Sequence, residues 1–261
     1  MTELAAHDLT VSLGGRIVLK GIDFAAQSGE LICILGPNGA GKSTLLRALA
    51  GLLKTKSITL DGQALNVLSP VARARTIGWL PQTGQAVWPL AVRSVVALGR
   101  MPHGVTLDSL TARDDMAIAQ ALSACDLDAL ADRDITTLSG GEQARAFLAR
   151  ALAVEAPILL ADEPVSALDP RHQLSVMETL QAQARANRLV IVVLHDLALA
   201  ARFADRIILM DKGAIAADGA PAAVLTPEQL GAVFGVEIVS FERDGVRAIL
   251  PWAARSMERE A

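Results

Sequence analysis

The chain has 261 residues, of which 52% are hydrophobic, and a formal net charge of −4 at pH 7. That length suits one α/β domain with a subsidiary lobe, and the lack of a lysine or arginine block argues against a nucleic-acid surface. Charged residues interrupt or bound the long apolar stretches before they reach the roughly 18 uncharged residues of a membrane-spanning helix, so no such helix is expected.

The first ten residues, MTELAAHDLT, include acidic residues and lack the basic, apolar and small-residue succession that marks a secretory signal. We therefore expect the chain to stay in the cytoplasm. The two cysteines, Cys33 and Cys125, are too few for a disulfide framework or a metal site between them, and both are expected to be buried thiols.

The N-terminal part of the chain predicts strands followed by a helix. Residues 9–13 and 17–25 alternate apolar and polar side chains around Gly14-Gly15, as two antiparallel strands joined by a turn do. Residues 30–35 lie between glycines and, after Glu30, are continuously apolar, which is typical of a strand buried on both faces. The other elements expected here are a helix from Lys42 to about Gly51 and strands at residues 58–60 and 77–80.

The rest of the chain first predicts helices and then an alternation. Residues from about 91 to 130 favour helices only, and Thr111 and Asp114 have the spacing of a capping box. Strands and helices then alternate, which indicates a parallel sheet with helical crossovers. The expected strands are residues 158–161, 189–194 and 206–210, with helices beginning near Asp169 and Asp196. Past Gly219 come short helices around Ala222 and Glu228, a hairpin through residues 236–249, and a frayed tail from Trp252.

A phosphate-binding loop follows the first buried strand. The residues that match the P-loop pattern are Gly36, Pro37, Asn38, Gly39, Ala40, Gly41, Lys42 and Ser43, followed by Thr44. The glycines let backbone amides point inward, and the helix start adds its partial positive charge. Lys42 is therefore expected to reach the β- and γ-phosphates of a nucleotide, and the Ser43 hydroxyl to ligate Mg²⁺. A glycine-rich connecting turn with a surface lysine is the alternative.

Two carboxylates end the strand at residues 158–161. P-loop proteins need a carboxylate for the metal at the end of a neighbouring strand, and Asp162 is placed for that role. Glu163, one residue further along, is placed to polarise an attacking water as the catalytic base. The alternative is that both residues cap the turn before Pro164.

A second helix start suited to anions precedes a strongly helical segment, in the sequence Leu138-Ser139-Gly140-Gly141-Glu142-Gln143. The helical insertion separates it from the P-loop, so one chain is not expected to clamp a single nucleotide with both. Clamping between two chains of a homodimer is the simpler arrangement.

Together these motifs resemble those of the ABC ATPase family, whose signature is LSGGE or LSGGQ, and the resemblance covers residues 9–219. Gln82 matches the family's Q-loop, Ser166 to Asp169 matches the D-loop, and His195 matches the switch histidine. The resemblance implies a P-loop NTPase core with a mixed, mainly parallel sheet, an N-terminal antiparallel β subdomain and a helical insertion. The implied divisions are a nucleotide-binding domain at 1–240, with its helical subdomain at about 84–155, and a C-terminal hairpin strand with a frayed tail at 241–261.

The resemblance also implies a role for the remaining site residues. Gln82 would contact the metal and the attacking water, and His195 the γ-phosphate. The residues implied to act on the partner's nucleotide or across the dimer seam are Ser139, Gly140, Gly141, Glu142 and Asp169. Structural alternatives stay open: a polar strand-end residue for Gln82, a capping or partly buried histidine for His195, and a plain N-cap for Asp169.

The chain departs from the family at one position. ABC ATPases usually stack an aromatic ring on adenine from the turn between the first two strands, and Leu13 occupies that place here, in a chain without tyrosine. Without a π-stacking surface, we expect weaker contact with the base and less strict discrimination against GTP. ATP is still the expected nucleotide, because phosphates dominate binding in such sites.

Residues 88–103, which end in Gly99-Arg100-Met101-Pro102-His103, resemble the "V..V..GR.PH" stretch of ATPases that serve importers of iron-siderophores, haem and vitamin B12. In those systems two ATPase copies work with two membrane permeases and a periplasmic binding protein. The resemblance therefore implies an ATP-hydrolysing subunit on the cytoplasmic side of the cell membrane, peripheral through a permease that docks on residues of about 83–103.

Two other classes of function are alternatives to this one. A soluble ABC ATPase acting on nucleic acid or ribosomes usually has two fused ATPase units, or a long coiled coil between P-loop and signature, and the sequence has neither. A scaffold without turnover is disfavoured by the complete set of catalytic residues. The cargo stays open among haem, ferric siderophore and cobalamin, and export is a further alternative, because cargo specificity lies in the binding protein and permease.

Overall fold

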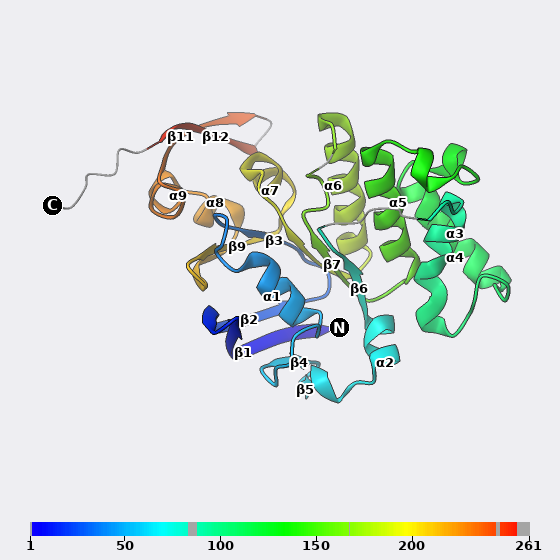
Figure 1. The fold of residues 1–261 in the computed structure, drawn as a ribbon. Helices are drawn as coiled ribbons and strands as arrows, with labels where there is room; N and C mark the ends of the chain where they lie inside the picture. Colours follow the sequence, from blue (N-terminus) through cyan, green and yellow to red (C-terminus); the bar gives the residue numbers. More distant parts are fainter. Residues whose placement is uncertain (1, 83–87, 167, 244–245, 255–261) are drawn as a thin grey trace.

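The computed structural model describes residues 2–82, 88–166, 168–243 and 246–254. Its central sheet contains β3 (Leu31–Leu35), β6 (Ile77–Leu80), β7 (Ile158–Asp162), β8 (Leu189–Val193), β9 (Arg206–Asp211) and β10 (Ala214–Gly219). They lie in the order β10-β9-β3-β8-β7-β6 (Figure 1). Neighbours from β9 to β6 run parallel, and β10 pairs antiparallel with β9. The mixed, mainly parallel sheet predicted from the sequence is thus confirmed.

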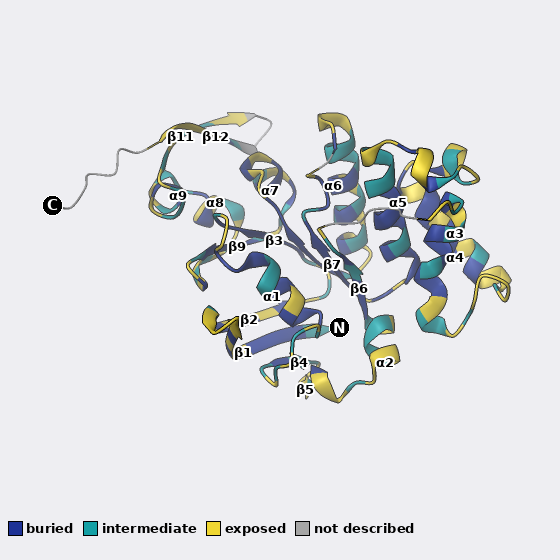
Figure 2. Ribbon diagram, in the orientation of Figure 1, coloured by how far each residue is buried: buried dark blue, intermediate teal, exposed yellow. Residues whose placement is uncertain are grey.

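The central strands are buried on both faces because each face packs on a separate hydrophobic core. In β3, Ile32 and Ile34 belong to one core, and Leu31, Cys33 and Leu35 to the other. Successive side chains of a strand point to opposite faces, so a strand between two cores must be apolar throughout. Figure 2 shows these strands as the buried centre of the molecule.

The first core lies between the central sheet and an antiparallel N-terminal sheet. The strands of that second sheet, in the order β2-β1-β4-β5, are β1 (Glu3–Leu13), β2 (Arg16–Gln27), β4 (Ile58–Leu60) and β5 (Gln63–Ala64). Helix α1 (Lys42–Leu49) contacts strands of both sheets. Because α1 lies between the two sheets, the position of the loop that precedes it is fixed.

Helices cover the other face of the central sheet (Figure 1). Those of the insertion are α3 (Val92–Ala97), η2 (Leu98–His103), α4 (Ala112–Ala124), η3 (Asp128–Leu130), η4 (Ile135–Thr137) and α5 (Gly140–Ala153). After it, α6 (Pro170–Arg185) and α7 (Leu197–Phe203) pack on the same core. Before it come η1 (Leu65–Val67), which contacts β4 and contributes Leu65 to the first core, and α2 (Pro70–Thr76), which contacts β6. The predicted capping box is confirmed: the Thr111 hydroxyl accepts from the Asp114 amide, and the Asp114 carboxylate accepts from the Thr111 amide.

The C-terminal part comprises α8 (Pro221–Val224), α9 (Pro227–Phe234) and a hairpin of β11 (Val236–Arg243) and β12 (Val246–Ala254). The tail was expected to fray from Trp252, but residues 252–254 continue β12, so this prediction was wrong for them; the rest of the tail lies outside the described residues. β11 crosses residue 240, and the domain division placed there stays a prediction.

Both cysteines are buried, as predicted, and burial raises the pKa of the Cys125 thiol to about 12. Within the described ranges, no helix is both long enough and apolar enough to cross a membrane.

Candidate functional site

The P-loop connects the end of β3 to the start of α1, and its glycines are required by close backbone packing. Gly36 and Gly41 have φ angles of 148° and 99°, in the region that favours glycine. A Cβ at Gly36 would lie 2.3 Å from the Met210 carbonyl oxygen, and one at Gly41 would lie 2.8 Å from Leu19 Cδ2. The loop backbone is therefore pressed against β9 and β2, which holds its shape.

Lys42 is buried at the mouth of this loop. Its Nζ donates to the carbonyl oxygens of Gly36, at 2.8 Å, and Pro37, at 3.1 Å. Burial lowers the pKa of Lys42, while the carboxylates of Glu163 and Asp162 act in the opposite direction. The ammonium group is thus held beside the loop amides, where a phosphate would meet both.

Oxygen ligands suited to a magnesium ion meet beside the loop. The Ser43 hydroxyl donates to Asp162 Oδ1 at 3.1 Å, and Asp162 is itself buried at the end of β7. Burial raises the pKa of Asp162, and the hydrogen bond from Ser43 opposes that shift. Over the described part of the chain no three His, Cys, Asp or Glu residues cluster as a metal site. This donor set fits Mg²⁺, which is usually held by one or two carboxylates with water and substrate phosphates.

Glu163 and His195 meet where the parallel neighbours β7 and β8 end. His195 Nε2 lies 2.6 Å from Glu163 Oε1. Glu163 has a φ of 52°, a left-handed conformation that is strained for a residue with a side chain. Strain of this kind persists where surrounding structure fixes it, and here the Glu163 amide donates to the Val193 carbonyl. The turn directs the carboxylate out of the strand toward the P-loop.

These elements enclose a pocket of about 270 Å³. It is lined by Val18, Asn38, Gly39, Gly41, Lys42, Ser43, Thr44, Gln82 and Glu163. Gln82, which the sequence associated with this site, therefore does reach it. Val18, from β2, was not anticipated, because no motif marks a strand residue whose only distinction is its place beside the loop.

The signature residues lie outside this pocket, at the start of α5. The Ser139 amide donates to Glu142 Oε2 at 2.8 Å, and the Glu142 amide donates to Ser139 Oγ at 3.3 Å. The Glu142 carboxylate accepts hydrogen bonds from Ser139, first from its backbone amide and then from its side chain, and these hold the pKa of Glu142 below its usual value. A Cβ built on Gly140 meets no atom within 4 Å, so this helix start faces open space.

Asp169 is the N-cap of α6 in this structure. Its carboxylate accepts from the His172 amide at 3.0 Å and lies 2.7 Å from His172 Nδ1. Both contacts lower the pKa of Asp169. Asp169 therefore caps α6, which is the structural alternative given for it from the sequence. It does not line the pocket of the P-loop.

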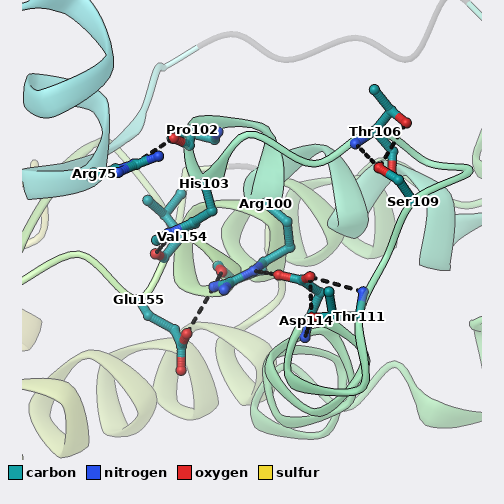
Figure 3. Close-up of polar contacts among 11 residues, drawn as sticks. Arg75, Arg100, Pro102, His103, Thr106, Ser109, Thr111, Asp114, Val154 and Glu155 are labelled. Carbon is teal, nitrogen blue, oxygen red and sulfur yellow. Dashed lines mark hydrogen bonds and ion pairs between the residues drawn. The ribbon is translucent and has the colours of Figure 1, made fainter.

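The Gly99-Arg100 stretch ties the helices of the insertion to one another (Figure 3). Arg100 is buried; its Nε donates to Asp114 Oδ1 and its Nη1 to Glu155 Oε2, both at 2.8 Å. Nη1 also donates to the Ala153 carbonyl, and His103 Nε2 lies 2.9 Å from the Val154 carbonyl. Both basic residues were included among the candidates for contact with a permease, but they are used inside the fold.

The family profile described as ABC transporter matches residues 19–166, more than half of the chain. The chain is also 47% identical over 257 residues to the hemin import ATP-binding protein HmuV of Nocardia farcinica, covering 95% of this chain and 88% of the relative. It is 43% identical to the protein of the same name from Pseudomonas aeruginosa, covering 90% of this chain and 94% of the relative.

Solved structures of ABC transporter chains also resemble this chain, at lower sequence identity. A chain of an inward-facing ABC transporter assigned to the metal-chelate type superposes with a TM-score of 0.81 at 27% identity, covering 97% of this chain and 98% of that chain. The dimeric ATP-binding cassette MJ0796 bound to ADP and phosphate superposes with a TM-score of 0.72 at 29% identity, covering 85% and 99%.

Proposed function

Because the chain belongs to the ABC transporter family of ATP-binding proteins, we propose that two copies close on two ATP molecules and drive a membrane permease that imports haem. Each ATP would lie between the P-loop of one copy and the Ser139 helix start of the other. The chain hydrolyses ATP to power transport, as its family does. The proposal is that each copy completes the ATP site of the other.

The observation that carries this proposal is the separation of the two anion-binding helix starts. The P-loop, Gln82 and Glu163 share one pocket, whereas Ser139 and Gly140 belong to another surface that faces open space. A helix start with free amides attracts phosphate. A second copy can bring its own Ser139 to the first copy's pocket, which a single chain does not do in this structure.

In the proposed reaction a water oxygen attacks the γ-phosphorus of ATP. The bond to the β–γ bridging oxygen breaks, and that oxygen leaves with the bonding electrons as part of ADP. Glu163 accepts the proton of the water, and His195, 2.6 Å from its carboxylate, holds that carboxylate in position and contacts the γ-phosphate. Ser43, Asp162 and Gln82 would hold a Mg²⁺ ion, which neutralises charge developing on the phosphates.

Closure of two chains would be transmitted to the permease through the insertion. The proposed docking segment is residues 83–103, of which residues 83–87 lie outside the described part. In residues 88–103, the described part of this segment, Trp88 and Met101 are the exposed large hydrophobic residues. This arrangement would place the chain on the cytoplasmic face of the cell membrane, with a substrate-binding protein beyond the permease.

The role of Glu163 is tested by Glu163→Gln, which keeps the shape and removes the base. General-base catalysis typically contributes about 10²–10⁴-fold, so we expect phosphate release to fall at least about 100-fold while ATP stays bound and a dimer accumulates in sedimentation. Glu178→Gln, on an exposed position of α6, is the matched control. Wild-type phosphate release by Glu163→Gln would exclude Glu163 as the base.

The cargo is proposed because the relatives of highest similarity reported above are named hemin import proteins. A strain lacking this chain should fail to grow with haem as its iron source and should still grow with ferric siderophores. The wild-type gene should restore growth, and Lys42→Ala should not. Loss of siderophore-dependent growth alone would show that haem is the wrong cargo while leaving the ATPase role intact.

A further inference from the structure

A second pocket, here called the basic pocket, lies at the opposite end of α1 from the P-loop. Its volume is about 590 Å³, and it is lined by Gly51, Leu52, Leu53, Lys54, Thr55, Lys56, Asn66 and Arg73. Residues 51–56 connect α1 to β4, Asn66 lies on η1, and Arg73 lies on α2 (Figure 1). Among the described residues none lines both this pocket and the pocket of the P-loop, so the two are separate.

The charged side chains of the basic pocket are all cations. Lys54, Lys56 and Arg73 form part of its wall, and no Asp or Glu of the described chain does. None of the three cations forms an ion pair with a described residue, in contrast to Arg100, which reaches two carboxylates. Like charges gathered without a counter-charge repel one another, so an anion placed among them is attracted by all three.

The basic pocket also offers hydrogen-bond donors that the fold leaves unused. The backbone amides of residues 53–56 have no acceptor within the described ranges, and the side chains of Lys54, Lys56, Asn66 and Arg73 donate to no described residue. Hydrogen bonds from ammonium and guanidinium groups to an anion are about twice as strong as those between neutral groups. The guanidinium fork also matches the spacing of two phosphate oxygens.

Arg73 is held at this pocket by the turn that ends α1. Gly51 has a φ of 66°, and a Cβ there would lie 2.7 Å from Arg73 Cδ and 3.2 Å from its Nε. The half-buried arginine therefore lies directly against this turn, and it has less side-chain entropy to lose when an anion binds. The carbonyls of residues 46–48 already accept from the amides of residues 50–52, so Arg73 is not needed to cap α1.

We propose that the basic pocket binds a phosphomonoester, that is, a phosphate group carried on a small organic molecule or on a lipid headgroup. The phosphate would lie among Lys54, Lys56 and Arg73. The organic part would contact Leu52 and Leu53, which line the same pocket. A phosphomonoester has a charge of about −1.5 to −2 at pH 7 and three acceptor oxygens, which suits three cations better than a carboxylate does. The pocket is within the range of about 300–1,000 Å³ that is usual for small-molecule sites.

Acetylation of lysines, followed by mass spectrometry, tests the site because it reports on each lysine separately. In the full chain at constant ionic strength, we expect inorganic phosphate and glycerol 3-phosphate to slow acetylation of Lys54 and Lys56 at least about threefold. Lys20, which is exposed and outside the pocket, is the control and should react at an unchanged rate. Phosphate bound at the P-loop does not cover these lysines, so the measurement is specific to the basic pocket.

Asn66→Asp places a carboxylate among the cations without changing the size of the side chain. The dissociation constant for glycerol 3-phosphate, measured from the same protection, should rise at least about tenfold, because the new charge repels the anion and pairs with the cations. Gln63→Glu, on β5 outside the pocket, adds the same charge and should bind normally. Both positions are exposed, so both variants should keep the fold, which thermal unfolding checks.

Vesicles distinguish a lipid headgroup from a soluble ligand. Phosphatidic acid has a phosphomonoester and phosphatidylserine does not, so protection of Lys54 and Lys56 by vesicles of the first lipid alone would identify a headgroup. Protection by glycerol 3-phosphate without any by vesicles would identify a soluble ligand, and either result supports the site. Equal slowing at Lys20, no slowing by any probe, or full protection in Asn66→Asp would overturn the inference. The ATP-clamped pair is tested separately by Glu163→Gln and would be unaffected.

Discussion

Leu13 stands at the end of β1, where an aromatic ring would stack on adenine in related proteins, and it is exposed. Aromatic stacking contributes about 0.5–1.5 kcal/mol beyond area burial, which is about two- to tenfold in affinity. We expect Leu13→Tyr to tighten ATP binding by that factor, measured by titration calorimetry. Leu52→Tyr, at another exposed leucine, is the control. Unchanged affinity would mean that the base does not reach this turn.

Gly140 and Gly36 differ in what requires a glycine: space for a ligand at Gly140, and close backbone packing at Gly36. A Cβ there meets no atom within 4 Å, so Gly140→Ala should leave the free energy of unfolding unchanged or raise it by up to about 1 kcal/mol. The added methyl group would stand on the helix start proposed to bind the partner's ATP, and we expect the ATPase rate to fall at least tenfold.

The contrasting variant is Gly36→Ala, whose Cβ would lie 2.3 Å from a backbone oxygen. It should lose both stability and ATPase activity, measured by thermal unfolding and phosphate release. Full activity of Gly140→Ala would contradict a phosphate contact at that helix start.

Arg100 and its hydrogen-bond partners Asp114 and Ala153 join η2, α4 and the end of α5. The hydrogen bonds from Thr111 and Arg100 hold the pKa of Asp114 well below its usual range. Removing one partner of a buried ion pair typically costs about 3–5 kcal/mol, and we expect Arg100→Met to destabilise the chain by that amount in urea unfolding. Arg93→Met breaks a pair with Asp115 in which both side chains are 49% exposed, and should cost less than about 1 kcal/mol. An equal loss of unfolding free energy in the two variants would show that burial of the Arg100 ion pair does not determine its contribution.

Local sequence patterns predicted most elements because their causes are local. The capping box at Thr111 and the N-caps at Asp169 and Asp196 are formed by residues three positions apart. β10 was missed, since its residues AIAADG are small or half exposed and carry no clear alternation. The inward direction of Arg100 could not be predicted either, because its partner Glu155 is distant in sequence and reaches it only in the folded chain.

The same distinction applies to the candidate site as a whole. The P-loop was predictable because strand, loop and helix are contiguous in the sequence. The meeting of Glu163 and His195 depends on the parallel pairing of β7 with β8, which places the ends of these two strands at one edge of the sheet. The left-handed backbone of Glu163 and the participation of Val18 depend on packing between elements, which no motif encodes. The signature at Ser139 was identified from its pattern, but its proposed partner is the P-loop surface of another copy, which a single chain does not contain.

For the whole transporter, the question is how closure reaches the permease. Trp88 is 74% exposed at the start of the insertion, and exposed tryptophans are frequent anchors of interfaces, where their loss costs 2 kcal/mol or more. We expect Trp88→Ser to weaken binding to the permease at least tenfold and to slow transport, measured in reconstituted vesicles. The ATPase rate of the isolated chain should not change, because Trp88 lies outside the nucleotide pocket. Val67→Ser, equally exposed on η1, should alter neither quantity. If Trp88→Ser transported normally, the docking surface would have to lie elsewhere, since Arg100 and His103 are already engaged inside the fold.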